Sequence, residues 1–200
     1  MIHEMLYTNQ CCLIGWVVLP TKLNGDVTMS AKTNTDGIVI DDKYTTGYQN
    51  FDLSNIVCYW VHLDPANPDT AFGNNKWCLE MRLDDEIAAQ LKAVGFSVGN
   101  KTEKDGTVTK NIFKAKKEVM TKSGVAQTPP NVVGPDGKTK WNFAETIGNG
   151  TVCNLQLSAK AWPIKGKWKM GCYITGVQVV DHVPYAGSFE DTTKKSDVPF

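Results

Sequence analysis

Residues 168–183 read WKMGCYITGVQVVDHV and carry the longest strand pattern in the chain. Apolar side chains take alternate positions from Trp168 to Ile174, which is the period of a β-strand with one buried face. Gly171 and Gly176 lie inside this pattern. Glycines within a strand are typical of the bulges and bends that small barrels need. The stretch therefore predicts one long, curved strand in a mainly β domain.

Runs rich in β-branched and aromatic residues predict further strands on the N-terminal side of this stretch. Turn-forming pairs such as Asn24-Gly25 and Asp36-Gly37 separate some of them, and a proline-rich excursion spans residues 123–140. The predicted strands are Cys11–Leu19, Ile56–Leu63, Trp77–Leu83, Thr107–Val119 and Thr151–Ala161, and residues 99–106 are predicted to form a loop.

One helix pattern interrupts the strands, over Leu83–Gly95. Asp84 is the expected N-cap, and the acidic residues Asp85 and Glu86 suit the positive end of the helix dipole. Apolar residues from Ile87 onward fall on one face. A metal site built from the three adjacent acids is the alternative, and the helix start is favoured because it accounts for all three.

Several strands and one short helix fit an oligonucleotide-binding (OB) fold, a small Greek-key barrel. An immunoglobulin-like sandwich is the competing architecture, but the helix between strands and the lack of a Cys…Trp…Cys framework count against it. The periodicity ends near Tyr185. We therefore expect a barrel domain over residues 1–186 and a disordered C-terminal tail over residues 187–200.

The charge is balanced overall but unevenly distributed. Residues 1–100 hold 6 basic and 12 acidic side chains, whereas residues 101–180 hold 13 basic and 5 acidic ones. Arg82 is the only arginine, so the basic charge is nearly all lysine. Such a lysine-rich region predicts a face that binds a polyanion through its phosphates. A solvated lysine face without a ligand is the equally open alternative.

Motifs for catalysis and metal binding are missing from the sequence. The chain has no phosphate-binding P-loop, no nucleophile elbow and no His-Glu-x-x-His pair, so we expect no enzyme activity, no cofactor and no metal. The six cysteines never form Cys-x-x-Cys, and the N-terminus carries no secretory signal. We expect reduced thiols, a cytoplasmic location and no membrane span.

Aromatic rings are interleaved with lysines in the basic region. The segment Lys160–Lys169 (KAWPIKGKWK) holds four lysines and two tryptophans and no acid. Lysines bind phosphates and exposed rings stack on bases without sequence preference. Each ring has an alternative role in the core. The candidate DNA-binding residues are Lys110, Phe113, Lys114, Lys116, Trp141, Trp162, Lys165, Lys167, Trp168, Lys169 and Tyr173.

The chain ends in Asp197-Val198-Pro199-Phe200. A free carboxylate next to a phenylalanine ring is an anchor that a partner protein can capture. This ending resembles the C-terminal peptide of bacterial single-stranded DNA-binding proteins.

Five stretches between residues 70 and 200 carry a second resemblance: Gly73–Trp77, Leu83–Gly95, Asn131–Gly137, Ile147–Val152 and Gly176–Val180. In their order they resemble the T7-type single-stranded DNA-binding proteins of tailed bacteriophages. Two departures are the lysines Lys194 and Lys195 in a tail that is usually strongly acidic, and the single arginine.

The resemblance implies a non-enzymatic protein that coats single-stranded DNA during replication or recombination in an infected bacterium. It also implies a homodimer and a tail that recruits a polymerase, primase or helicase. An all-β virion protein without DNA affinity is the alternative function.

Overall fold

The computed structural model describes residues 32–71 and 75–185. Contacts divide the chain into one unit of Met1–Ser30 and a second of Ala31–Phe200. The predicted strand Cys11–Leu19 and the predicted tail 187–200 lie outside the described residues, so both stay predictions. All that follows concerns the second unit.

The described part of the chain is mainly β and forms a seven-stranded sheet in the order β3-β4-β2-β1-β6-β7-β5. Two helices interrupt the strands, and only β5 pairs in parallel. The elements are α1 (Asp42–Thr46), β1 (Gln49–His62), β2 (Lys76–Arg82), α2 (Asp85–Ala93), β3 (Gly99–Thr102), β4 (Val108–Glu118), β5 (Asn131–Val133), β6 (Thr151–Ile164) and β7 (Lys167–Asp181).

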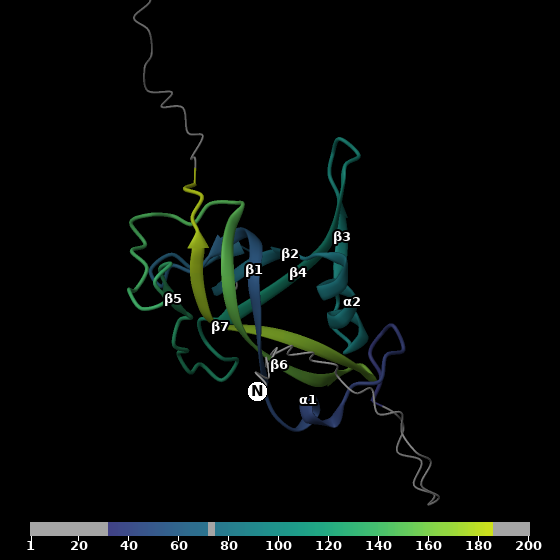
Figure 1. The fold of residues 1–200 in the computed structure, drawn as a ribbon. Helices are drawn as coiled ribbons and strands as arrows, with labels where there is room; N and C mark the ends of the chain where they lie inside the picture. The colour runs from purple at the N-terminus through teal and green to yellow at the C-terminus, as the bar shows by residue number, and fades with distance from the viewer. Residues whose placement is uncertain (1–31, 72–74, 186–200) are drawn as a thin grey trace, which may run out of the picture. The chain divides into compact units, whose positions relative to one another are not determined.

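Four strands form a Greek key, since β6 returns over a long connection to pair with β1 and gives the spatial order β6-β1-β2-β4. Strand β7 extends this series beyond β6 and also contacts β4, which brings the two ends of the series together. Five long strands closed in this way are the partly open barrel of the OB fold. The predicted fold class is confirmed. Figure 1 shows β6 and β7 as a pair of long curved ribbons.

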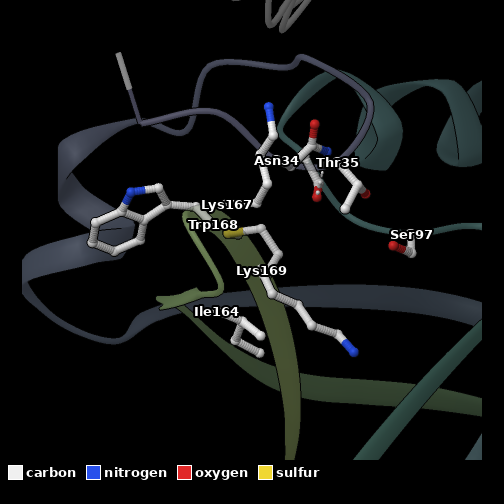
Figure 2. A pocket seen from close by; sticks show the side chains of 9 residues that line it. Asn34, Thr35, Ser97, Ile164, Lys167, Trp168 and Lys169 are labelled. Carbon is white, nitrogen blue, oxygen red and sulfur yellow. Dashed lines mark hydrogen bonds between the residues drawn. The ribbon is translucent and has the colours of Figure 1, made fainter. Parts of the chain in front are cut away.

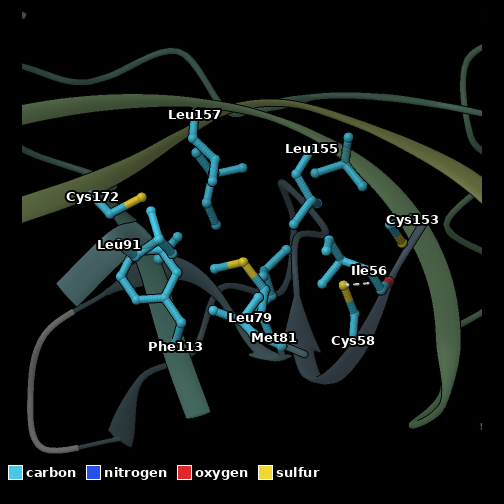
Figure 3. Close-up of a cluster of buried hydrophobic side chains, with 14 of the residues drawn as sticks. Ile56, Cys58, Leu79, Met81, Leu91, Phe113, Cys153, Leu155, Leu157 and Cys172 are labelled. Carbon is cyan, nitrogen blue, oxygen red and sulfur yellow. Dashed lines mark hydrogen bonds between the residues drawn. The ribbon is translucent and has the colours of Figure 1, made fainter. Parts of the chain in front are cut away.

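Side chains of β2, β6 and β7 fill the barrel interior. Leu155 and Leu157 of β6 pack with Met81 of β2 and Ile174 of β7, and each of these side chains is at most 1% exposed. Figure 3 shows part of this core, including the thiols of Cys58 and Cys153. Among the described residues, Cys58, Cys78, Cys153 and Cys172 form no disulfide.

Helix α2 begins where the sequence predicted. The Asp84 carboxylate accepts the N–H of Ile87 at 2.7 Å, which caps the first turn. Ala88 and Leu91 are buried against the barrel. Gly95 follows with a φ of +99°, and a Cβ at this position would overlap Ile40. A glycine in the left-handed region therefore ends the helix.

Several elements differ from the sequence prediction. Strand β1 begins at Gln49 rather than Ile56, α1 was not predicted, and Gly99–Thr102 forms the strand β3 where a loop was expected. Pairing in β1 shifts at two places, between Leu53 and Ile56 and between Tyr59 and His62. Such bulges bend a strand and increase its twist, and they are hard to predict from periodicity because they break it.

Candidate nucleic-acid interface

The β6–β7 hairpin places one set of side chains on a single outer face. Trp162 lies opposite Lys169, Lys160 opposite Gly171, and Ile164 opposite Lys167. Directly opposed residues of an antiparallel pair share a face of the sheet. Their neighbours Ala161 and Met170 are buried on the other face. We call residues Lys160, Trp162, Lys167, Lys169 and Tyr173, with Tyr48 described below, the hairpin face.

The two strands continue to a two-residue turn at Lys165 and Gly166. Both residues have positive φ, +49° and +78°, as a type I′ turn requires. The predicted strands ended at Ala161 and began again at Trp168, which left residues 162–167 outside any strand. The segment Lys160–Lys169 is a hairpin whose strands extend nearly to the turn, because this turn type matches the twist of a β-ribbon. The lysines and rings are therefore held on regular strands.

Gly171 seats the ring of Trp162 instead of forming a bulge. Pairing at Gly171 is regular, and a Cβ there would overlap the six-membered ring of the Trp162 indole. The predicted irregularity occurs at the other glycine, where pairing shifts between Gln156 and Leu157, opposite Gly176. The missing side chain at Gly171 thus leaves room for the half-buried Trp162 ring against the neighbouring strand.

Three aromatic rings form a continuous cluster on this face. The Trp162 and Tyr173 ring centroids are 6.3 Å apart, and Tyr173 meets Tyr48 edge-on at 5.6 Å. Burial, with Tyr48 and Glu118 nearby, raises the pKa of the Tyr173 hydroxyl. Tyr173 therefore stays neutral at physiological pH, so the cluster adds no negative charge beside the lysines.

Tyr48 and Lys160 are members that the sequence analysis missed. The Lys160 ammonium lies 5.0 Å from the centroid of the Tyr48 ring, which is 59% exposed. Tyr48 reaches β6 because β1 begins at Gln49, opposite Ala159. Lys160 was part of the quoted basic segment, so its position was a usable signal. Tyr48 had none, because no strand was predicted near it.

Ion pairing separates the predicted lysines into two groups. Lys114 pairs with Glu80 at 3.0 Å and Lys116 with Glu118 at 2.7 Å, both on the barrel strands β2 and β4. Within residues 32–71 and 75–185, no carboxylate lies within ion-pair distance of the hairpin lysines. These are Lys160, Lys165, Lys167 and Lys169; Lys110, exposed near the start of β4, is also unpaired in these ranges. The sequence between Glu145 and Asp181 contains no acid. Within the described residues, the hairpin lysines that border the rings therefore carry positive charge that no carboxylate compensates.

Phe113 is a correction to the predicted set. It is 3% exposed and meets Phe96 edge-on in the core at 5.3 Å. Neighbours along β4 point to opposite faces, and the exposed Lys114 forces Phe113 inward. We assign Phe113 to packing.

Trp168 and Trp141 do not join the hairpin face. Trp168 lies on the opposite side of β7 from Lys169, packs on the core, and has the Lys32 ammonium 5.4 Å from its ring. Trp141 donates its indole N–H to the Glu145 carbonyl at 3.0 Å and meets the ring of His182. The two tryptophans of the basic segment therefore do not form one stacking surface; Trp162 alone lies on the hairpin face.

Trp60 is exposed where the sequence predicted a core strand. Trp60 is 57% exposed, its φ is +50°, and its backbone N–H donates to the side-chain oxygen of Asn149 at 2.8 Å. The bulge between Tyr59 and His62 turns this residue out of the alternating pattern. No signal in the apolar run around Trp60 indicated this bulge.

Residues 32–71 and 75–185 hold no group of three His, Cys, Asp or Glu side chains placed to bind a metal ion. Among the same residues, no helix is both long and apolar enough to span a bilayer.

Comparison with known proteins gives matches among solved structures. No family model matches the sequence, and no curated protein matches it. The single-stranded DNA-binding protein from bacteriophage Enc34 is 15% identical, with a TM-score of 0.45 over 72% of this chain and 88% of that chain. The structure of that protein in complex with single-stranded DNA is 14% identical, with a TM-score of 0.47 over 69% of this chain and 89% of that chain. The single-stranded DNA-binding protein gp2.5 encoded by bacteriophage T7 is 15% identical, with a TM-score of 0.44 over 68% of this chain and 93% of that chain.

Proposed function

We propose that this protein binds single-stranded DNA without sequence preference, through the hairpin face. The observation that carries the proposal is the juxtaposition of Trp162, Tyr173 and Tyr48 with lysines that no described carboxylate neutralises. Rings that can stack on bases and cations that can hold phosphates are the two components of a sequence-independent single-strand site. An OB barrel supplies the scaffold on which such sites are commonly built.

The chemistry favours a single strand over a duplex. Stacking on Trp162 or Tyr48 requires an unpaired base whose flat face is free, and a duplex offers such faces only at its ends. Lysine acts as a point charge on phosphate and carries little base information, which agrees with binding that ignores sequence. No step of this function requires catalysis, so we propose a non-enzymatic role.

The direct test is fluorescence anisotropy with labelled oligothymidine and with a duplex of equal length. We expect binding to the single strand and at least ten-fold weaker binding to the duplex. Tryptophan fluorescence should fall when oligothymidine is added, because Trp162 stacks on a base. Equal affinity for both nucleic acids would contradict the stacking half of the proposal. No affinity for either would favour the alternative, an all-β virion protein.

We further propose that the tail, Asp197 to Phe200, binds a replication protein such as a polymerase, primase or helicase. The support is the terminal carboxylate beside an aromatic ring, a combination that peptide-binding pockets capture. On this proposal the protein acts as a homodimer in DNA replication or recombination, in the cytoplasm of an infected bacterium.

The tail is tested by deleting residues 188–200 and, separately, by adding one glycine after Phe200. The deletion is expected to leave the melting temperature unchanged and to abolish partner binding. The added glycine moves the carboxylate and keeps every side chain, so it should also weaken partner binding. Partner binding that survives both changes would show that the tail is not the anchor.

A further inference from the structure

A pocket of about 210 Å³ with both polar and apolar lining residues lies beside the turn end of the β6–β7 hairpin. Thr35 and Ser97 line it from two loops, and Lys167 and Lys169 line it from β7. Figure 2 shows the two lysines extending from β7, with Thr35 and Ser97 on the loops, and the Trp168 ring turned away from Ser97. The pocket lining thus includes two lysines and two hydroxyl side chains from three separate segments.

No acid lines this pocket. Its lining residues are neutral or cationic, and the acid next in sequence, Asp36, is not among them. Lys167 and Lys169 have no carboxylate partner in the described ranges. Ammonium and hydroxyl donors without competing acceptors are the groups that hold phosphate oxygens.

The loop side of the pocket is fixed in place. Asn34 is 4% exposed, and its side-chain oxygen accepts the N–H groups of Asp36 and Ile38 at 2.9 and 2.8 Å. Its amide nitrogen donates to the Gly95 carbonyl at 3.3 Å. The backbone N–H of Trp168 donates to the Thr33 carbonyl at 2.9 Å, and this bond connects the same loop to β7. These bonds preorganise the pocket, so little ordering entropy remains to be lost on binding.

We infer that this pocket binds one phosphate group, held by Lys167, Lys169, Thr35 and Ser97. The inference rests on the proposed function, because Lys167 and Lys169 also belong to the hairpin face and the bound strand is the expected source of the phosphate. Thr35 and Ser97 then fix the position of one phosphate while the rings stack on bases. The phosphate is either a phosphodiester within the strand or a terminal phosphate.

The test removes the hydroxyls and keeps every lysine, in the double variant Thr35→Val with Ser97→Ala. Thr128→Val, at an exposed threonine outside the pocket, is the matched control. Oligothymidine with a 5′-hydroxyl and with a 5′-phosphate are the probes. We expect the double variant to lose about ten-fold in affinity with its salt dependence unchanged, because hydrogen bonds to a charged group are lost and no cation is removed.

A loss with both oligonucleotides assigns the pocket to an internal phosphodiester. A loss confined to the 5′-phosphorylated strand assigns it to a terminal phosphate. Unchanged affinity for both strands overturns the inference, provided that the wild-type protein binds them. Circular dichroism melts confirm that each variant is folded.

Inorganic phosphate gives a readout that does not depend on DNA binding. In the wild-type protein, it is expected to shift the backbone amide signals of Thr35 and Ser97 in nuclear magnetic resonance spectra, and the double variant should not respond. If the wild-type protein fails to bind oligothymidine yet shows these shifts, the proposed function is wrong and the pocket stands. If oligothymidine binds and phosphate shifts neither signal, the inferred phosphate site is wrong and the proposed function is retained.

Discussion

Strand β4 and the β6–β7 hairpin both interleave lysines with aromatic residues, yet the structure gives them different electrostatic roles. On β4, Lys114 is opposite Glu80 on β2, and Lys116 pairs with Glu118 on its own strand. On the hairpin the residues opposite the lysines are uncharged: Trp162 faces Lys169, and Ile164 faces Lys167. Neighbouring acids, on the adjacent strand or on the same strand, therefore decide which lysines are free for a ligand.

The aromatic residues of the two regions differ in the same way. Phe113 of β4 points inward and packs on Phe96, whereas Trp162 of β6 points outward onto Gly171. The first ring is needed for stability and the second is available to a ligand. The pair teaches that an aromatic residue among lysines is a candidate for stacking only after its face of the strand is known.

Replacing Phe113 with alanine should produce the largest effect. Removing a fully buried phenylalanine costs about 3–5 kcal/mol in the free energy of unfolding. For a domain of this size the melting temperature should fall by roughly 10 °C. Thermal melts by circular dichroism measure this. The fraction that remains folded should bind oligothymidine as the wild-type protein does, and a selective loss of affinity would return Phe113 to the binding site.

Trp162→Ala should show the reverse pattern. Losing one stacking ring is expected to cost about 1–3 kcal/mol of binding, or roughly 5- to 150-fold in Kd, for every DNA sequence alike. The half-buried ring should matter less to stability than Phe113. Trp60→Ala is the matched control, because Trp60 is exposed but lies off the hairpin face. Equal losses in the two tryptophan variants would break the assignment of stacking to the hairpin.

Lysine variants sharpen the comparison through salt dependence. For single strands, log K falls with log salt at a slope of about −0.7 per phosphate contact, so removing one contact should reduce the slope by about 0.7. We expect this reduction for Lys169→Gln. Lys116→Gln, an exposed lysine paired with Glu118, should change the slope much less. Identical slopes for the two variants would mean that ion pairing does not determine which lysines contact phosphates.

Local chemistry explains which parts of this fold were predictable. The start of α2 was predicted at Asp84 because a cap and its helix are neighbours in sequence. The strands β2, β4 and β7 were predicted because each keeps a two-residue period over most of its length. Strand β1 was predicted too short, since two bulges break its period.

The candidate binding site was predictable in composition but not in arrangement. The basic segment 160–169 supplied the candidates Trp162, Lys167 and Lys169, but its hairpin structure was not predicted. The pairing of Lys114 with Glu80, however, joins residues on different strands, and the contact between Tyr48 and Lys160 depends on where β1 begins. Such contacts depend on the register between strands, which no single stretch of sequence specifies.

The smallest effect we predict is a loss of stability at alkaline pH. Burial, followed by the nearby Asp69 carboxylate, raises the pKa of the Cys78 thiol to about 11, and burial also raises that of Cys172. In the unfolded chain these thiols ionise near pH 8.5–9, so between pH 9 and 11 the unfolded state releases protons that the folded state retains. The stability is therefore fully present below pH 9 and falls as the pH rises.

Melts between pH 7 and 10.5 measure this fall, and Cys78→Ser is the informative variant. Serine does not ionise in this range, so the variant should lose less stability between pH 9 and 10.5 than the wild-type protein, whatever its stability at pH 7. DNA affinity measured over the same pH range reports on the hairpin face. Tyr173 has a raised pKa and stays neutral to higher pH, so affinity should hold at a pH where stability has begun to fall. If affinity and stability instead fell together from pH 9, binding would depend on the barrel core rather than on the hairpin face.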